Sequence, residues 1–386
     1  MADPGVIVIA KKEFFDHLRS RKFLLLLGIL TIIACMGLLS GVSEYRENVK
    51  WYNEMQKYPS QDDDSPVSSY LKLKPSVLVV FCNTCQLLSV TGGILGIAMG
   101  FDLLTKEKES RSLKLLLAHP AYRDEVINGK ALGGIAAIAL ALGIVLAALL
   151  GILLVMSILP DAAECGIILL VFAITFLYIF TFFALSLLMS VLCGESGKAL
   201  IYSLFIFLVL GSLVPAIVSS PLVMDPVIGQ KPEMSQAIID QMMDLAELPK
   251  NQVRTQNRTE LQVGTLNREE WDRYNRQLRE HGNRELGLKE IQYLISPTEN
   301  YKKITTCLTS PTWTRIVLYS TRGESLVQKI DNQGRRIWVS IDYNPKIDYD
   351  LSGILALISG NLITLLAFPL VFFGLAYASF MKMDIR

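Results

Sequence analysis

The chain has 386 residues, of which 51% are hydrophobic and 19% are charged, and its formal net charge is +1. The apolar residues are gathered into blocks of about 20 or more, which excludes an ordinary soluble globular protein and indicates a membrane protein. The polar loops mix both signs of charge, so neither offers the basic surface that nucleic-acid-binding proteins use.

Six blocks are long and apolar enough to cross a bilayer. We therefore expect an all-α polytopic membrane protein with six transmembrane helices, at residues 22–42, 76–102, 126–159, 166–193, 197–220 and 350–380. Basic residues cluster before the first block and between the second and third, whereas the connection between the third and fourth has none. The positive-inside rule then places both termini in the cytoplasm, with residues 43–75 and 221–349 outside the cell membrane and residues 381–386 forming a cytoplasmic tail.

Residues 1–21 predict an amphipathic helix that lies in the headgroup plane just before the first span. Its apolar stripe is formed by Ile7, Ala10, Phe14 and Leu18. Lys12, Asp16 and Arg19 lie opposite. The periodicity leaves two roles open for this interfacial helix, a plain anchor or a mechanical part.

Residues 103–125 form a charged stretch between two apolar blocks. They predict a short helix with Leu113, Leu116 and Leu117 on one face and Lys108, Arg111 and Lys114 turned away, ended by Pro120. Asp124 and Glu125 suit the start of the helix that continues into the third span. The residues alone allow either a solvated loop helix or a docking surface for a cytosolic partner.

Residues 221–349 predict a folded extracytoplasmic domain of α+β type. We expect helices at residues 232–245, 267–281 and 285–295, and short strands at residues 315–320 and 335–343. A glycosylation sequon begins at Asn257, and Cys165 could pair with Cys307 if the two lie close together. The sequence decides neither of these modifications.

Catalytic and metal-binding patterns are weak in this chain. The "GESGKA" string at residues 194–199 lacks the first glycine and the hydroxyl residue of a phosphate loop and lies between two membrane helices. The three histidines, His17, His119 and His281, are divided between the two sides of the membrane, and Cys82 with Cys85 lacks a second ligand pair. We expect no enzyme activity, no catalytic residue and no metal site.

Polar side chains within the spans are candidates for lining a translocation path. They are Asn83, Thr84, Gln86, Ser186, Ser190 and Asn361. Hydrogen bonding between helices is the other role that the sequence leaves open for them. The spans contain essentially no acid or base away from their ends, which fits a transporter powered from outside the membrane and disfavours an intramembrane enzyme.

The string from Glu107 to Leu117, followed by Pro120, Arg123 and Gly129-Lys130, resembles the segment between the second and third helices of ABC-2 type permeases. These are the membrane subunits of ABC exporters with six helices per half. The order of three further segments supports the resemblance: "AKKEFFDHLRSRKFL" at residues 10–24, "ISPTENY" at residues 295–301 and "FMKMDIR" at residues 380–386. The basic Arg111 and Lys114 depart from the family pattern, as does the large outer segment.

The resemblance implies that residues 103–125 form a coupling helix, which docks on a separate ATP-binding subunit. The docking residues would be Glu107, Glu109, Arg111, Leu113, Leu116 and Leu117. Two ATPase subunits and a second permease, identical or similar, would complete the exporter, and ATP and Mg²⁺ would bind to the ATPase alone. The alternative is a membrane-anchored scaffold or sensor with an extracytoplasmic ligand-binding domain and no transport. The sequence identifies neither the cargo nor the choice between homodimer and heterodimer.

Overall fold

The structure, a computed structural model, is almost entirely helical. It describes residues 5–56, 76–110, 122–236, 268–309, 326–330, 336–340 and 351–383. Within these ranges six helical segments are long and apolar enough to cross a membrane, which confirms the expected number of spans. They correspond in order to the six apolar blocks of the sequence.

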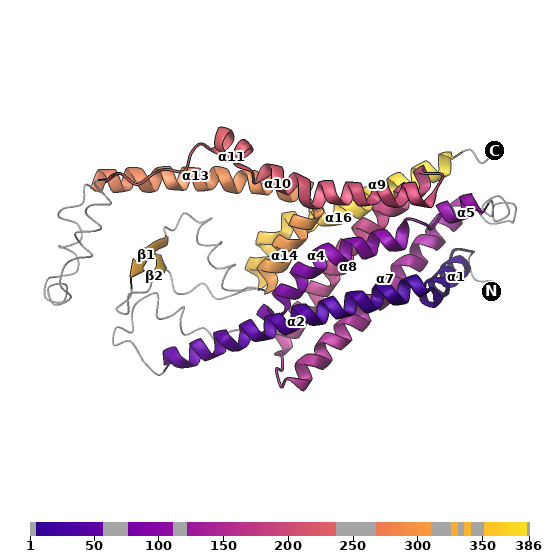
Figure 1. The fold of residues 1–386 in the computed structure, drawn as a ribbon, viewed down its shortest axis with the longest axis horizontal. Coiled ribbons are helices and arrows are strands. Elements are labelled where there is room, and N and C mark those ends of the chain that lie inside the picture. Colours follow the sequence, from indigo (N-terminus) through magenta and orange to yellow (C-terminus); the bar gives the residue numbers. More distant parts are fainter. Residues whose placement is uncertain are drawn as a thin grey trace. The chain divides into compact units, whose positions relative to one another are not determined.

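An amphipathic helix, α1 (Gly5–Arg19), precedes the first span. The elements that follow are α2 (Arg21–Gln56), the short 3-10 turn η1 (Val77–Val79), α4 (Val80–Gly100), α5 (Thr105–Glu109) and α7 (Arg123–Val155). Figure 1 shows α1 beside α7. The interfacial helix is therefore held against the spans rather than standing apart from them.

The remaining spans are α8, a composite fifth span and α16. Their bounds are α8 (Ala162–Leu192), then α9 (Ser196–Leu208) continued by the π-helical η2 (Val209–Leu213) and by α10 (Val214–Val218), and α16 (Leu351–Lys382). α8 is the central helix because it contacts α4, α7, α9 and α16. Its inner residues, such as Tyr178, Phe182 and Phe183, are fully buried.

Glycines spaced four residues apart bring helices into close contact at three places in the chain. Added Cβ atoms would collide with α4 at Gly37 and Gly41 of α2, with α8 at Gly96 and Gly100 of α4, and with α1 at Gly129 and Gly133 of α7. Small residues at this spacing allow helix backbones to approach closely. In a membrane, where the hydrophobic effect does not drive helices together, the van der Waals contacts made in this way stabilise their association.

The chain divides into two compact units: Met1–Leu213 together with Tyr293–Arg386, and Val214–Gln292. The second unit contains α11 (Pro221–Ile228) and most of α13 (Arg268–Ile295). In it, the Arg284 guanidinium donates to the Ile228 carbonyl at 3.4 Å. The expectation of separate helices at residues 267–281 and 285–295 is wrong, because α13 continues through Gly282, where a glycine costs only about 1 kcal/mol relative to alanine.

A short helix that the sequence analysis did not predict, in residues assigned to the outer domain, lies within the first unit. This helix, α14 (Pro297–Thr309), packs against α4, α8 and α16, as Figure 1 shows. The expected outer domain, residues 221–349, is thus divided between two units of the structure. We use "the bundle" for the spans of the first unit together with α1 and α14.

Two strands, β1 (Leu326–Ile330) and β2 (Arg336–Ser340), pair antiparallel, with Gln328 opposite Trp338. β2 falls within the strand expected at residues 335–343, whereas β1 was not expected, and residues 315–320 lie outside the described residues. One hairpin does not make a domain of α+β type, so that part of the expected fold stays a prediction. Asn257 also lies outside the described residues, and Cys165 and Cys307 form no disulfide with each other.

Candidate functional site at the α5 end of the bundle

α1 docks on the beginning of α7, where two glycines leave room for it. A Cβ atom at Gly129 would lie 2.8 Å from Ile9, and one at Gly133 would lie 2.6 Å from the Cβ of Glu13. Ile9, Phe14 and Leu18 pack against the core. Ile7, expected on the same stripe, is 50% exposed, so the packed face is turned slightly from the one that the sequence predicted.

One buried cation joins α1, α5 and α7 at this end of the bundle. The Lys130 ammonium lies 2.6 Å from Glu13 of α1 and 2.8 Å from Glu107 of α5, and its side chain is only 3% exposed. The second carboxylate oxygen of Glu107 is buried without a hydrogen-bond partner. One positive charge therefore holds two carboxylates from helices that are far apart in sequence.

His17 and a second ion pair lie next to this group. The Lys22 ammonium lies 3.1 Å from Asp102 and 4.0 Å from the centre of the Phe101 ring. The Nε2 atom of His17 is buried without a hydrogen-bond partner. Burial lowers the pKa of His17 from its ordinary value of 6.5, an effect that Glu13 and Asp102 oppose and that the two lysines reinforce.

α5 is attached to the turn between α8 and α9. The Lys108 ammonium donates to the carbonyl oxygens of Ser190, Val191 and Cys193 at 3.2, 2.5 and 3.0 Å. Glu109 accepts a hydrogen bond of 2.5 Å from the backbone N–H of Ser196, the first residue of α9. Lys108, which the sequence placed on the side away from the leucine face, makes three hydrogen bonds within the chain.

The start of α7 is bonded to another helix of the bundle as well. The Arg123 guanidinium, at the start of α7, donates to the carbonyl oxygens of Met383 at 2.8 Å and Met381 at 3.4 Å, near the end of α16. Tyr122 donates its backbone N–H to Glu125 at 3.2 Å, which caps α7. Both ends of the segment that links α5 to α7 are therefore bonded to other helices of the bundle.

The residues expected to dock on an ATPase fall into two groups. Glu107 and Glu109 lie on α5 and bond within the chain, to Lys130 and to Ser196. Arg111, Leu113, Leu116 and Leu117 lie outside the described residues. Their docking role stays a prediction, and the two acidic residues have an intramolecular role that the sequence did not indicate.

The role of the six candidate path residues in a translocation path stays a prediction, and three of them make hydrogen bonds in the described residues. Asn83 donates to Ser40 and Glu44 of α2, at 3.4 and 3.3 Å. Ser186 donates to the carbonyl oxygens of Gly96 and Phe183, at 3.4 and 2.9 Å. Ser190 accepts from the backbone N–H groups of Leu104 and Thr105, at 3.0 and 3.1 Å. Apart from the bond of Ser186 to Phe183 within α8, these contacts join different helical segments, the other role that the sequence left open.

The remaining three candidates differ in exposure. Thr84 is buried at 1% exposure, and its hydroxyl has no hydrogen-bond partner. Asn361 is buried, and its backbone carbonyl accepts from the side-chain amide of Asn300 at 3.0 Å. Gln86 is exposed on α4, with the Cys82 sulfur 4.0 Å from its amide nitrogen. Gln86 is therefore the candidate in the spans most open to a solute or a partner.

α14 brings a buried polar cluster into the middle of α4 and α8. The Tyr301 ring stacks on Tyr178 with ring centroids 4.4 Å apart, and its hydroxyl lies 2.9 Å from the Thr175 hydroxyl. The Tyr178 hydroxyl bonds to the Ser89 carbonyl and lies 3.3 Å from the Thr298 hydroxyl. This helix was not predicted from the sequence, although a stripe at Tyr301, Thr305 and Leu308, spaced by four and three residues, could have indicated it.

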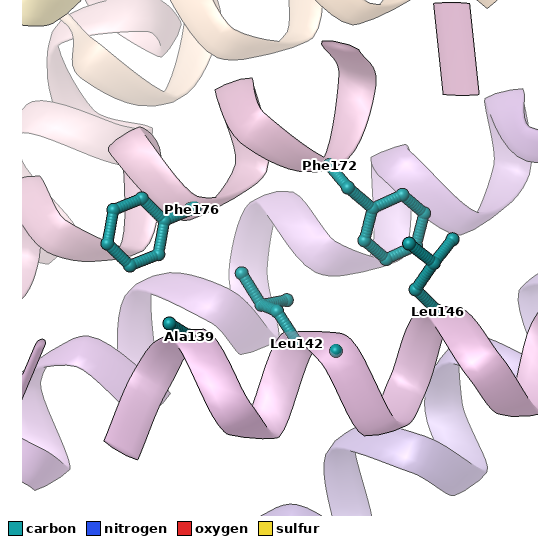
Figure 2. Close-up of a pocket in the computed structure, with 6 residues that line it drawn as sticks. Ala139, Leu142, Leu146, Phe172 and Phe176 are labelled. Carbon is teal, nitrogen blue, oxygen red and sulfur yellow. The ribbon is translucent and has the colours of Figure 1, made fainter. Parts of the chain in front are cut away.

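An apolar hollow of about 190 Å³ lies between α7 and α8. Figure 2 shows Phe172 and Phe176 on one helix above Ala139, Leu142 and Leu146 on the other. Gly143 completes the lining, and no charged residue contributes to it. The hollow can hold hydrocarbon and has no group that could do acid or base chemistry.

The "GESGKA" string lies at the turn between α8 and α9. Lys198 pairs with Glu195 at 3.0 Å on the surface of the α8–α9 turn. Among the described residues, no group of three or more His, Cys, Asp or Glu side chains could hold a metal ion.

The family description "ABC-2 family transporter protein" matches residues 7–385, nearly the whole chain. The chain belongs to the ABC-2 transporter family. It is a multi-pass membrane protein and a permease component of an ABC transporter, a class that works with an ABC ATP-binding partner. A comparison with curated proteins gives no match. The family assignment favours transport over the scaffold or sensor alternative for this ABC-2 protein.

Proposed function

We propose that this chain forms the translocation path of an ABC exporter and that residues 103–125 are its coupling helix. Two copies, or one copy with a similar permease, would bind two ATPase subunits, which hold the ATP and Mg²⁺. Both termini and the α5 end of the bundle would face the cytoplasm of the cell. The polar side chain of Gln86, exposed on an apolar helix, supports a path or a second permease along this face of α4.

The observation that carries this proposal is the bonding of the coupling segment at both ends. Lys130 binds Glu107 of α5 and Glu13 of α1, and Arg123 binds the end of α16. A force applied by a partner to residues 111–121 would therefore reach α1 and α7 through the buried ion pairs of Lys130. It would reach α16 through the two hydrogen bonds of Arg123. A solvated loop helix would gain nothing from such attachments.

The coupling assignment can be tested with the Leu113→Asp/Leu116→Asp double variant. Burying one leucine contributes about 1.5–3 kcal/mol, and about 1.4 kcal/mol is a factor of ten in affinity. We expect the double variant to insert normally and to lose copurification with the ATPase. Lys106→Ala is the control, since Lys106 is exposed on α5. Retained copurification of the double variant, with hydrolysis still coupled to transport, would exclude the docking role.

Export is the direction that we propose. Inside-out vesicles containing the complex should accumulate an amphiphilic fluorescent probe when ATP is added outside, because their cytoplasmic face is turned outward. The same vesicles carrying the Leu113→Asp/Leu116→Asp variant are the control. Loss of the probe from preloaded vesicles upon addition of ATP would indicate import. The purified chain alone should hydrolyse no ATP above background, since it lacks a phosphate loop.

A further inference from the structure

Lys108 and Glu109 bind the two helix ends that meet at the α8–α9 turn. The carbonyl groups at the end of α8 have no partner in the next helical turn, and the Lys108 ammonium bonds to three of them, those of Ser190, Val191 and Cys193. Glu109 bonds to the first N–H of α9, at Ser196. A cation at a helix C-terminus and an anion at a helix N-terminus each match the local helix dipole.

The beginning of α5 is attached to the same turn. The Ser190 hydroxyl accepts from the N–H groups of Leu104 and Thr105, and the Ser196 hydroxyl donates to the Thr105 hydroxyl at 3.0 Å. Both ends of the five-residue α5 are thus bonded to residues that flank the α8–α9 turn. A displacement of α5 along or across the bundle would have to move the ends of the fourth and fifth spans with it.

We propose that Lys108 and Glu109 are positioning residues that transmit movement of the coupling segment to α8 and α9. This inference rests on the proposed function, because it requires an ATPase that moves residues 111–121. It adds a second route of transmission, through the α8–α9 turn, to the route through Lys130 and Arg123. The bonds of Lys108 and Glu109 are charge-assisted and therefore among the stronger hydrogen bonds of a protein.

A purely structural role for the pair predicts a different outcome. Lys108 is half-buried and Glu109 is exposed. Water can therefore solvate the freed carbonyl and N–H groups when either side chain is shortened or neutralised, and the fold should survive. A structural role would appear as lower stability with unchanged ATP-driven movement. A transmitting role would appear as lost movement with ATPase binding retained.

The test uses a single cysteine as a reporter on the turn. Gly197 has open space around it, so Gly197→Cys can be introduced into a full-length chain whose six native cysteines are replaced by alanine. The rate of maleimide labelling is measured in the reconstituted complex with the ATPase, without nucleotide and with ATP plus vanadate. We expect the rate to change by about fivefold or more, the lower end of coupling between linked sites.

The Lys108→Met/Glu109→Gln variant should lose this change. It should still copurify with the ATPase and hydrolyse ATP, because Glu109 bonds within the chain to Ser196 and we now assign the docking to Leu113, Leu116 and Leu117 instead. Lys106→Met, on the exposed side of the same helix, is the matched control and should behave as the parent does. The Lys108→Arg variant keeps the cation and should retain most of the ATP-driven change in labelling rate. Glu109→Gln alone, at an exposed position, provides a second variant if the double variant fails to fold, and it should weaken the response.

The outcomes separate this inference from the proposed function. If the parent chain does not copurify with the ATPase, the docking proposal fails, and the transmission role fails with it. If the parent binds the ATPase and the double variant keeps the full ATP-driven change in labelling, only the transmission role is overturned. Loss of the change in the Lys106→Met control would also overturn it, because the effect would then belong to α5 as a whole.

Discussion

At the α5 end of the bundle, one buried ammonium group faces two carboxylates. The Lys130 ammonium lies 2.6 Å from Glu13 and 2.8 Å from Glu107. Among the described residues, no other salt bridge to either carboxylate is seen. Breaking a buried ion pair by removing one partner leaves an uncompensated charge, which is more costly than losing the attraction itself. The stability of α1 on α7 should therefore depend on Lys130.

We expect Lys130→Met to lower the free energy of unfolding by about 3–5 kcal/mol, the usual cost of leaving a buried charge unpaired. The measurement is equilibrium unfolding in SDS from mixed micelles. Adding Glu13→Gln and Glu107→Gln to the same chain should recover most of the loss, since no carboxylate then stays unpaired. Equal stability of the single and triple variants would show that charge pairing is unimportant here.

His17 gives the same region a dependence on pH. Burial lowers the pKa of His17 in the folded protein below its ordinary value of 6.5. The unfolded chain then takes up the proton first as the pH falls, so stability that is present above about pH 6.5 is lost below it. We expect the thermal midpoint of unfolding to decrease as the pH is lowered from about 7.5 to about 5.5. The decrease should be smaller in the His17→Gln variant. Identical slopes would rule out this contribution.

At the scale of elements, the contact between α4 and α8 includes glycines at which the two backbones approach closely. The added Cβ at Gly96 would collide with the backbone carbonyl of Ile179, which cannot move aside as a flexible side chain can. Gly151, on α7, has nothing within 4 Å of its added Cβ. The two positions form a matched pair on spanning helices.

Gly96→Ala should destabilise the protein by about 1–3 kcal/mol, the usual cost of overpacking a well-filled core. Gly151→Ala should be neutral or stabilising by up to about 1 kcal/mol, because alanine is the better helix former. Thermal unfolding of both variants in the same detergent provides the comparison. Equal effects of the two substitutions on stability would contradict the close approach of the α4 backbone to the α8 backbone at Gly96.

The elements differ in how far the sequence could predict them. Each span is marked by its own apolar residues, so hydropathy alone located all six. α14 was missed as a member of the bundle because Glu299, Lys302 and Lys303 make it look like an exposed helix. A local stripe could have indicated the helix, but not where it packs, because its contacts with Tyr178 and Asn361 join residues that are distant in the chain.

The candidate site was predictable only in outline. The stretch around α5 stood out because it is charged between apolar blocks. No pattern in the sequence pairs Lys130 with Glu13, which lies 117 positions away. A lysine a few residues inside an apolar helix does indicate that an acidic partner exists somewhere. The bonds of Lys108 to backbone carbonyl groups leave no trace in the sequence, because carbonyl groups belong to every residue.

At the scale of the whole molecule, the orientation that we propose follows from the basic residues near the α5 end. Cysteines introduced at Ser65 and Gln333 should react with a membrane-impermeant maleimide in intact cells, because we place both segments outside. A cysteine at Ser112 should react only after the membrane is permeabilised, since we place it in the cytoplasm. Labelling of the Ser112 variant in sealed cells would reverse the topology.

The position of α14 has a consequence for biosynthesis. A 13-residue helix that carries three charges is too short and too polar to enter a bilayer as an independent segment. It is also synthesised after α4 and α8, the helices that enclose Tyr301. The earlier spans must therefore leave the insertion machinery with a gap between them, one that exposes the Tyr178 hydroxyl. The bundle can close only when a late, polar part of the chain fills that gap, so chains truncated before residue 297 should be recognised by membrane quality control as unfinished.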